Sequence, residues 1–304
     1  MRLTACLLAL ATALGAPAAH AAKPQYQPFV LASTTDASVE AAAAATRSAL
    51  EDAGFAWVGQ YRPVPESLVM VFTRDDLLKA AAATERGGYA AAQRVSVTRT
   101  DEGTEVAFVN PQYLQHAYRV GAELDGVRGD LVRALGQDHD CGADGEKMTA
   151  DKLADYHYMV GMPRFDEPYE LGAYPSHEAA VAAVEAGLAR PDDGLTEVYR
   201  IDIPGKAQTV FGVGMRATGE ADEDIDEGRQ MAVVDFEGCR KTAYFPYEVL
   251  VDGGDVEALH MRFRMAVHFP DLSMMGKHGF TKLMPFPGAI EDALKAMLAG
   301  VDAP

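Results

Sequence analysis

The chain repeats one pattern of predicted helices and strands along its length. An alanine-rich stretch that begins at Ser38 and ends near Gly54 has a counterpart that begins at Ser176 and ends near Gly194. Serine suits the first position of a helix, because its side-chain oxygen accepts a hydrogen bond from a free backbone N–H. Each stretch is therefore predicted to be a helix, and the chain is predicted to fold as two similar units.

The segments that follow the two helices also correspond. Each helix leads into a strand, a turn that contains proline, a second strand, a variable insertion, two more strands and a closing helix. The strands are predicted at 56–61, 68–72, 94–98 and 105–110 in the first copy and at 197–203, 209–215, 248–251 and 259–269 in the second, with closing helices at 129–135 and 289–298. This order predicts an α+β fold of two tandem repeats, each a small antiparallel sheet with helices packed on one face.

The repeats divide the rest of the chain. Residues 22–135 form the first predicted unit, residues 136–171 a linker and residues 172–304 the second unit. The linker is rich in Asp, Gly and Pro, with a short helix expected near 149–158. Its aromatic and methionine side chains are too apolar for a free tether, so we expect the linker to pack against the two units.

Short motifs within the repeats resemble a known family. They are Asn110-Pro111 and Pro270-Asp271 at the ends of predicted strands, and the run Phe-Pro-Tyr-Glu-Val-Leu-Val over 245–251. Together with the tandem arrangement, they resemble the domain-of-unknown-function family numbered 302. The resemblance implies an exported bacterial protein with a compact α+β fold in tandem copies. It implies no activity and no catalytic residues.

The N-terminus has the pattern of a cleavable signal peptide. A positive start at Arg2 precedes an apolar run, and small residues lead to a cleavage site after Ala21. The apolar run is too short for a stable membrane anchor, since a spanning helix needs about 20 residues. Residues 1–21 are therefore predicted to be removed, leaving a soluble periplasmic or secreted protein without membrane insertion.

Two cysteines, Cys141 and Cys239, remain after this cleavage, and they lack the short spacing of metal ligands. An even number of cysteines in an oxidising compartment favours a disulfide, so we predict that the two are bonded.

The predicted mature chain is strongly acidic. Residues 1–21 contain one arginine and no acid, which leaves 26 basic and 45 acidic residues and a net charge of −19. A surface of this charge repels phosphate backbones and anionic lipids. Nucleic acid is therefore excluded as an expected partner.

Catalytic motifs are incomplete or missing in the sequence. His177-Glu178 begins a pattern similar to the zinc-protease helix motif, but Val181 stands where the second histidine is needed. The Gly-Val-Gly-Met-Arg-Ala run at 212–217 is followed by acidic residues instead of a helix that could bind pyrophosphate. The sequence also lacks a nucleophile elbow and a phosphate-binding loop. We therefore assign no catalytic residue and expect no cofactor.

The C-terminal part of the chain contains a candidate ligand-binding surface. If residues 259–269 form a strand, alternate side chains share one face. That face carries His260, Arg262, Arg264 and His268 in an otherwise acidic protein. Arginine binds carboxylate and phosphate groups through paired donors. This basic strand face is predicted to bind a small anionic ligand or an acidic protein segment.

A turn after this segment contains a candidate metal site. Met274, Met275 and His278 lie close together in the sequence, and thioether with imidazole is a ligand set that suits copper(I). An ordinary apolar turn is the alternative interpretation of the same residues.

The sequence therefore favours an exported noncatalytic binding or interaction protein, because a duplicated small domain without a catalytic constellation is better suited to holding a ligand. Extracytoplasmic copper handling and an enzyme with an unrecognised site are the two alternatives.

Overall fold

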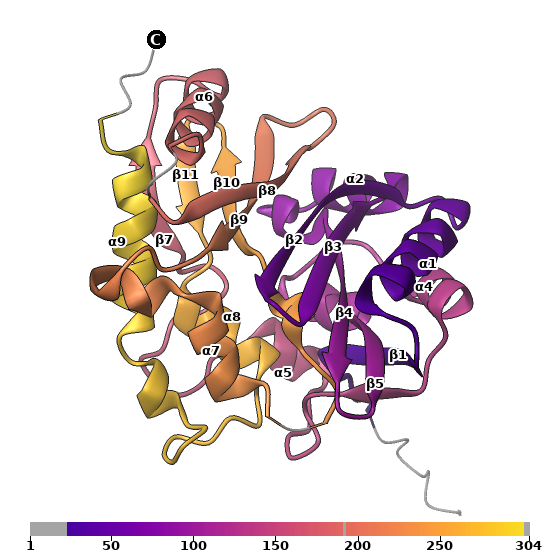
Figure 1. Cartoon of the computed structure of the whole chain (residues 1–304). Helices are drawn as coiled ribbons and strands as arrows, with labels where there is room; N and C mark the ends of the chain where they lie inside the picture. Colours follow the sequence, from indigo (N-terminus) through magenta and orange to yellow (C-terminus); the bar gives the residue numbers. More distant parts are fainter. Residues whose placement is uncertain (1–22, 191–192, 237, 301–304) are drawn as a thin grey trace, which may run out of the picture.

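Two antiparallel sheets dominate the protein (Figure 1). The computed structural model describes residues 23–190, 193–236 and 238–300, so the predicted signal peptide lies outside the described residues. The two sheets and the helices around them confirm the predicted α+β class. Among the described helices, none is long and apolar enough to cross a membrane.

The first sheet has six strands in the order β2-β3-β4-β5-β1-β6. Its strands are β1 (Phe29–Thr35), β2 (Ala56–Val64), β3 (Ser67–Thr73), β4 (Gln93–Thr100), β5 (Gly103–Val109) and β6 (His139–Cys141). The helices of this part are α1 (Val39–Asp52), α2 (Asp75–Ala82), the short 3-10 helix η1 (Gly87–Ala90), α3 (Pro111–Ala117), α4 (Asp125–Leu135) and α5 (Ala150–Ala154). We call the part from β1 to α4 the first half.

The second sheet has five strands in the order β7-β11-β10-β9-β8. Its strands are β7 (Tyr169–Ala173), β8 (Leu195–Asp202), β9 (Gln208–Met215), β10 (Tyr247–Asp252) and β11 (Asp255–Ala258). The helices are α6 (His177–Leu188), η2 (Glu220–Ile225), α7 (Glu227–Val234), η3 (Thr242–Tyr244), α8 (Met261–His268), η4 (Phe280–Leu283) and α9 (Phe286–Leu298). We call the part from β7 to α9 the second half.

The two sheets share one strand order. The run β2-β3-β4-β5-β1 in the first half corresponds, strand by strand, to β8-β9-β10-β11-β7 in the second. The strand registers show which residues of the two sheets are equivalent. Arg94 of β4 pairs with Val71 of β3, and at the corresponding position Glu248 of β10 pairs with Gly212 of β9. Arg94 and Glu248 are thus oppositely charged residues at the same position of the two sheets.

The first helix of each half begins as the sequence predicts. The hydroxyl of Ser38 accepts a hydrogen bond from the backbone N–H of Ala41, and Ser176 does the same for Ala179. Helices α1 and α4 lie on one outer side of the molecule, and α6 and α9 lie on the opposite side (Figure 1). The sheets therefore turn their other faces towards the interior, where the two halves meet.

Each half places a short helix on the sheet of the other half. The segment η1 of the first half contacts β9 and β10, and η3 of the second half contacts β3, β4 and β5. A buried ring of three hydroxyl groups anchors η3, because Thr242 lies 2.9 Å from both Ser67 and Thr98, which are 2.7 Å apart. The two inner faces are thus interlocked by exchanged segments.

Residues 259–269 do not form the predicted strand. Strand β11 ends at Ala258, and His260 caps helix α8 by accepting a hydrogen bond from the backbone N–H of Arg262 at 3.2 Å. The alternation of apolar residues was misleading because this helix is buried on nearly all sides, with seven of its eight residues buried. A completely buried helix has no polar face, so its sequence lacks the helical period that distinguishes it from a strand.

The segment predicted as a linker is structured. It contains β6, α5 and the start of β7, and Leu153, Tyr156 and Phe165 are buried in the core. The predicted disulfide between Cys141 and Cys239 is present, with a Cα–Cα distance of 6.4 Å. It joins the edge strand β6 to the segment that leads into η3.

Candidate functional site

The edge strands β2 and β8 cross where the two halves meet. A β-carbon at Gly59 would lie 2.0 Å from the carbonyl oxygen of Val198, so only glycine allows this approach. By register, Gly59 and Tyr199 occupy equivalent positions of the two sheets, since they pair with Val71 and Gly212. The crossing therefore lies at the pseudosymmetric centre of the molecule.

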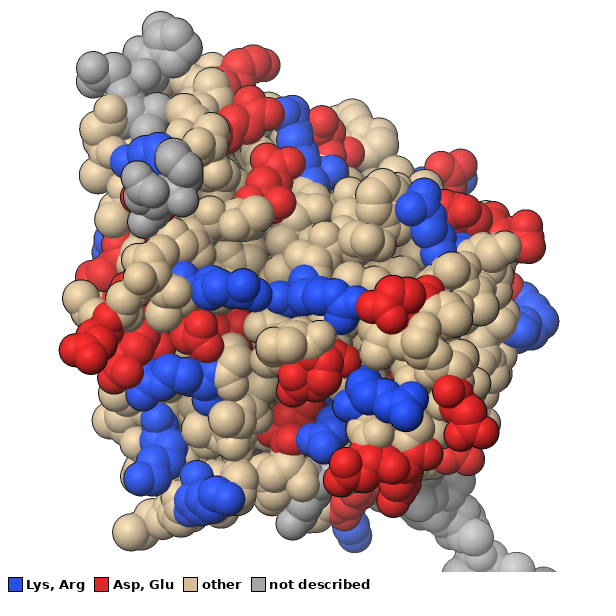
Figure 2. All heavy atoms as spheres, viewed as in Figure 1, with Lys and Arg blue, Asp and Glu red and all other residues tan. Residues whose placement is uncertain are grey.

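A solvent-facing hollow of about 400 Å³ lies next to this crossing, and we call it the seam hollow. It is lined by Tyr61 and Arg62 of the first half and by Gly194, Leu195, Thr196, Gly214, Met215, Arg216, Ala217, Thr218 and Glu227 of the second. On the side of the molecule seen in Figure 1, a row of Lys and Arg side chains crosses the middle, with acidic side chains around it (Figure 2). The hollow combines residues of both halves, and two of them, Arg62 and Arg216, are basic.

The seam hollow contains a buried carboxyl group. The Tyr61 hydroxyl donates a hydrogen bond to Glu227 Oε1 at 2.9 Å, and Glu227 is 2% exposed. Burial raises the pKa of Glu227 to about 8, although the Tyr61 hydrogen bond and the more distant positive charge of Arg264 oppose the shift. Glu227 is therefore mostly protonated and uncharged at neutral pH.

The two arginines of the hollow differ in their partners. Arg62 forms an ion pair with Glu40 at 2.7 Å. Arg216 is exposed and donates to the carbonyl oxygen of Arg62 at 3.2 Å, and no carboxylate of the described residues lies within ion-pair distance of it. The positive charge of Arg216 is thus available to a ligand.

Below the hollow, charged and aromatic side chains form a second group, which we call the seam cluster: Arg94, Tyr118, Tyr244, Glu248, Arg264 and His268. All six are buried. Arg94 Nη1 lies 2.8 Å from Glu248 Oε2, and Arg264 Nε lies 3.8 Å from the same oxygen. The carboxylate of Glu248, which is equivalent to Arg94 in the other sheet, therefore contacts two guanidinium groups.

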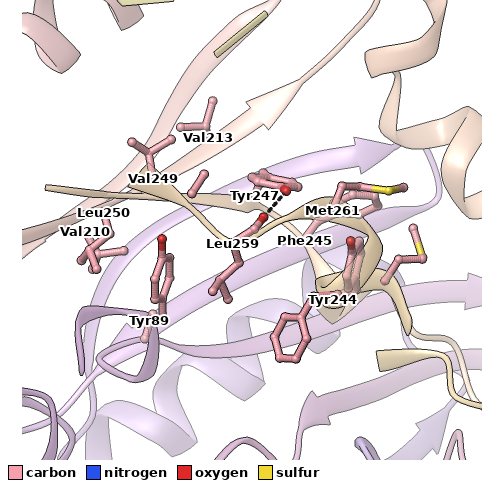
Figure 3. Close-up of a cluster of buried hydrophobic side chains, with 14 of the residues drawn as sticks. Tyr89, Val210, Val213, Tyr244, Phe245, Tyr247, Val249, Leu250, Leu259 and Met261 are labelled. Atoms are coloured by element: carbon pink, nitrogen blue, oxygen red, sulfur yellow. Dashed lines mark hydrogen bonds between the residues drawn. The ribbon is translucent and has the colours of Figure 1, made fainter. Parts of the chain in front are cut away.

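Aromatic rings and backbone carbonyls surround Arg264. Its Nη2 donates to the carbonyl oxygens of Tyr244 and Pro246, each at 2.5 Å, and its guanidinium carbon lies 4.0 Å from the centre of the Tyr244 ring. Figure 3 shows Tyr244 beside Phe245, with Tyr247 donating a hydrogen bond to the Leu259 carbonyl. Cation–π contact and carbonyl acceptors both stabilise a buried guanidinium.

The four residues of the predicted basic strand face do not form one surface. Arg264 and His268 point into the core, and His260 caps α8. Burial, helped by the neighbouring Arg262, lowers the pKa of His260 to about 4, so this histidine is neutral at physiological pH. Only Arg262 lines a surface hollow, which is small and mostly apolar. The four residues separate because the segment is helical. In a helix, residues four positions apart share one face, so Arg264 and His268 point inward together.

The residues of the predicted copper site point in different directions. Met274 lines the same small hollow as Met261 and Arg262. His278 Nδ1 lies 3.0 Å from the Val233 carbonyl, and its ring stacks on Phe236. Met275 is largely exposed. The described residues contain no group of three or more His, Cys, Asp or Glu side chains that could hold a metal ion, but a thioether site is not of this kind and stays a prediction.

Of the seam residues, only Arg264 and His268 were predicted as ligand-binding residues from the sequence, and they were placed on a strand face. Tyr61 and Glu227 are 166 positions apart, and only the fold brings them together. One signal was present, namely Glu248 inside the mainly apolar run of β10, with Arg94 at the aligned position of β4. Charges in such positions are rare in the absence of a partner.

Comparisons with family models, curated proteins and solved structures found no match for this chain. The resemblance to the domain-of-unknown-function family therefore stays a prediction.

Proposed function

We propose that the protein is an exported, noncatalytic binding protein that holds a small anionic ligand, such as a carboxylate, in the seam hollow. The observation that carries the proposal is the pairing of Arg216, which has no carboxylate partner among the described residues, with the neutral Glu227 at the same hollow. Arginine supplies charge and paired donors, and a protonated carboxyl group does not repel an anion.

The size of the hollow fits this proposal. Small-molecule sites usually have volumes of about 300 to 1,000 Å³. The seam hollow has about 400 Å³ and takes Tyr61 and Arg62 from the first half and Arg216 and Glu227 from the second. A ligand in the seam hollow would contact both halves. The shape of its site would depend on how β2 and β8 lie relative to each other.

Binding of simple dicarboxylates, from malonate to adipate, and of citrate tests the proposal by isothermal calorimetry. Arg216→Ala should weaken binding of the best probe by about tenfold or more, because a charge-assisted hydrogen bond contributes roughly 1.5 to 3 kcal/mol. Arg133→Ala is the matched control, since Arg133 is exposed on α4, outside the hollow, and its loss changes the net charge equally. Equal binding by the two variants, or no binding of any probe, would contradict the proposal.

The proposal also predicts a pH dependence. Glu227 becomes ionised above about pH 8, and its negative charge then repels an anion. The facing groups do not reverse this effect, because Tyr61 and Arg264 both have raised pKa values and keep their protons in this range. The affinity of the best probe should therefore fall between pH 7 and pH 9.5 in the natural protein and change less in Glu227→Gln. A parallel fall in both proteins would exclude Glu227 from the site.

A further inference from the structure

The seam cluster contains most of the unpaired buried polar atoms of the described residues. Among the described residues, twelve buried side-chain nitrogen and oxygen atoms lack a hydrogen-bond partner. Nine of these twelve atoms belong to the seam cluster. Arg94 Nη1 and Glu248 Oε2 are in contact as an ion pair but are not aligned for a hydrogen bond. Buried polar groups are nearly always satisfied, so such a concentration at one place indicates a missing partner.

The unpaired atoms are mainly donors. They include Nε and Nη2 of Arg94, Nε and Nη1 of Arg264, and the hydroxyl groups of Tyr118 and Tyr244. Burial raises the pKa of both tyrosines, so their hydroxyl groups keep their protons. The missing partner must therefore accept several hydrogen bonds.

The charges of the cluster do not balance. Arg94 and Arg264 contribute two positive charges, and Glu248 contributes one negative charge. His268 Nδ1 lies 2.8 Å from the Arg264 carbonyl, which requires a proton on that nitrogen, and burial together with the two arginines lowers the pKa of the ring, so His268 is neutral. Glu227, the acid on the hollow side, is protonated at neutral pH. One positive charge is left in the seam cluster, and a buried charge of this kind is costly without a counter-ion.

We propose that the seam cluster binds a small monovalent anion of the chloride type, held by Arg94, Arg264 and the hydroxyl groups of Tyr118 and Tyr244. An anion of this kind accepts several hydrogen bonds at once and neutralises the excess charge. A water molecule would satisfy some of the donors but would not neutralise the excess positive charge. A divalent anion would change the net charge of the cluster from +1 to −1. The site joins the halves, because Arg94 and Tyr118 come from the first and Tyr244 and Arg264 from the second.

Halide-dependent stability tests this proposal. The protein is exchanged into methanesulfonate buffer, which contains no carboxylate, and its thermal unfolding midpoint is measured with increasing chloride or bromide at constant ionic strength. A ligand that binds only the folded state raises the midpoint in a saturable way. We expect this for both halides, and we expect crystals grown in bromide to show anomalous scattering between Arg94 and Arg264. Identical midpoints in chloride, bromide and methanesulfonate, with no bromide peak in the cluster, would mean that water alone occupies it.

Two tyrosine variants make the test specific. Tyr118→Phe removes an unpaired donor and no hydrogen bond of the protein, so the variant should fold and bind chloride about tenfold more weakly. Tyr156→Phe is the matched control, because the Tyr156 hydroxyl already donates to the Ala266 carbonyl at 2.9 Å. It should lose stability but keep the chloride affinity. If both variants bind chloride as the natural protein does, the assignment to the cluster is wrong.

The halide test is independent of the proposed function. Arg216→Ala removes the arginine of the seam hollow that has no carboxylate partner among the described residues and leaves the seam cluster intact, so this variant should keep its full response to chloride. Loss of the response in Arg216→Ala would place the halide in the hollow and overturn the internal site. Failure of every carboxylate probe would leave the halide experiment unaffected.

Discussion

At the scale of single residues, the partners of each buried charge decide how the protein responds to pH. Glu248 lies against two guanidinium groups, whereas Glu227 has a tyrosine hydroxyl as its side-chain partner and no cation within ion-pair distance. Burial without a close cation disfavours the ionised form of a carboxyl group. Glu227 is therefore an acid whose titration should be visible in the stability of the protein.

Replacing Glu227 by glutamine should change the pH dependence of stability. The pKa of Glu227 is about 8 in the folded protein and near 4.5 in the unfolded chain. Between these values the folded state binds more protons than the unfolded state, so the free energy of unfolding falls as the pH rises. The natural protein should thus lose on the order of a few kcal/mol between pH 5 and pH 9 relative to Glu227→Gln. Urea unfolding at several pH values measures this difference.

Glutamine is the appropriate replacement for this experiment, because its side-chain oxygen still accepts the hydrogen bond from Tyr61. The other charged groups near Glu227, Arg264 and Asp226, are unchanged in the variant. If the unfolding free energies of the two proteins run parallel from pH 5 to pH 9, Glu227 does not titrate in this range and the proposed pH dependence of ligand binding loses its basis.

At the scale of elements, the crossing of β2 and β8 fixes the geometry of the seam hollow. The close approach depends on Gly59, because the obstacle to a side chain there is the backbone of β8, which cannot rotate away as a side chain can. Tyr199 of β8 also donates to Glu248 Oε1 at 3.1 Å. A displacement of β8 would therefore disturb both the hollow and the seam cluster.

The variant Gly59→Ala should accordingly be destabilised by about 2 kcal/mol or more, since an overfilled contact costs roughly 1 to 3 kcal/mol and the backbone must move. Gly126→Ala is a useful comparison, because Gly126 lies in α4 with no atom within 4 Å of an added β-carbon. This second change should be neutral or stabilising by up to about 1 kcal/mol, as alanine favours the helix. Denaturant unfolding separates the two, and a tolerated Gly59→Ala would show that the crossing is not tight.

Some elements could be predicted from the sequence because their signals are local. The serine caps identify the starts of α1 and α6, and alternation with a proline turn identifies β2, β3, β8 and β9. Strands β1 and β7 were missed, since they stand before the caps at which the repeat was recognised. Helix α8 was predicted as a strand because nearly all of it is buried.

The candidate site could not be predicted by the same means. Its members come from elements of both halves, among them β2, β4, α7, η3, β10 and α8, and their contacts depend on how the two halves pack. The alignment of the repeats did pair Arg94 with Glu248, but it gave no reason for these residues to touch. Their contact follows from the pseudosymmetric arrangement, which brings equivalent positions of the two sheets together at the centre.

At the scale of the whole molecule, the halves are connected by more than the chain between them. The exchanged helices η1 and η3 pack on the opposite sheets, the strands β2 and β8 cross, and the seam cluster takes residues from both halves. We therefore expect the two halves to unfold in one cooperative transition.

The disulfide acts on this interlocked arrangement from one side. Cys141 and Cys239 are 98 positions apart and buried, and the bond joins the edge of the first sheet to the segment that carries η3. In the chain-entropy model, a closed loop of about 100 residues stabilises the folded state by roughly 4 to 5 kcal/mol, because it restricts the unfolded chain.

The variant Cys141→Ala/Cys239→Ala should lose about this much unfolding free energy, as measured by urea unfolding followed by circular dichroism. The natural protein with reductant in the unfolding buffer should match the variant, and without reductant its mature form should show no titratable thiol. A loss below about 1 kcal/mol would mean that the bond restricts the unfolded chain far less than the chain-entropy model requires, whereas two titratable thiols before reduction would mean that the bond does not form.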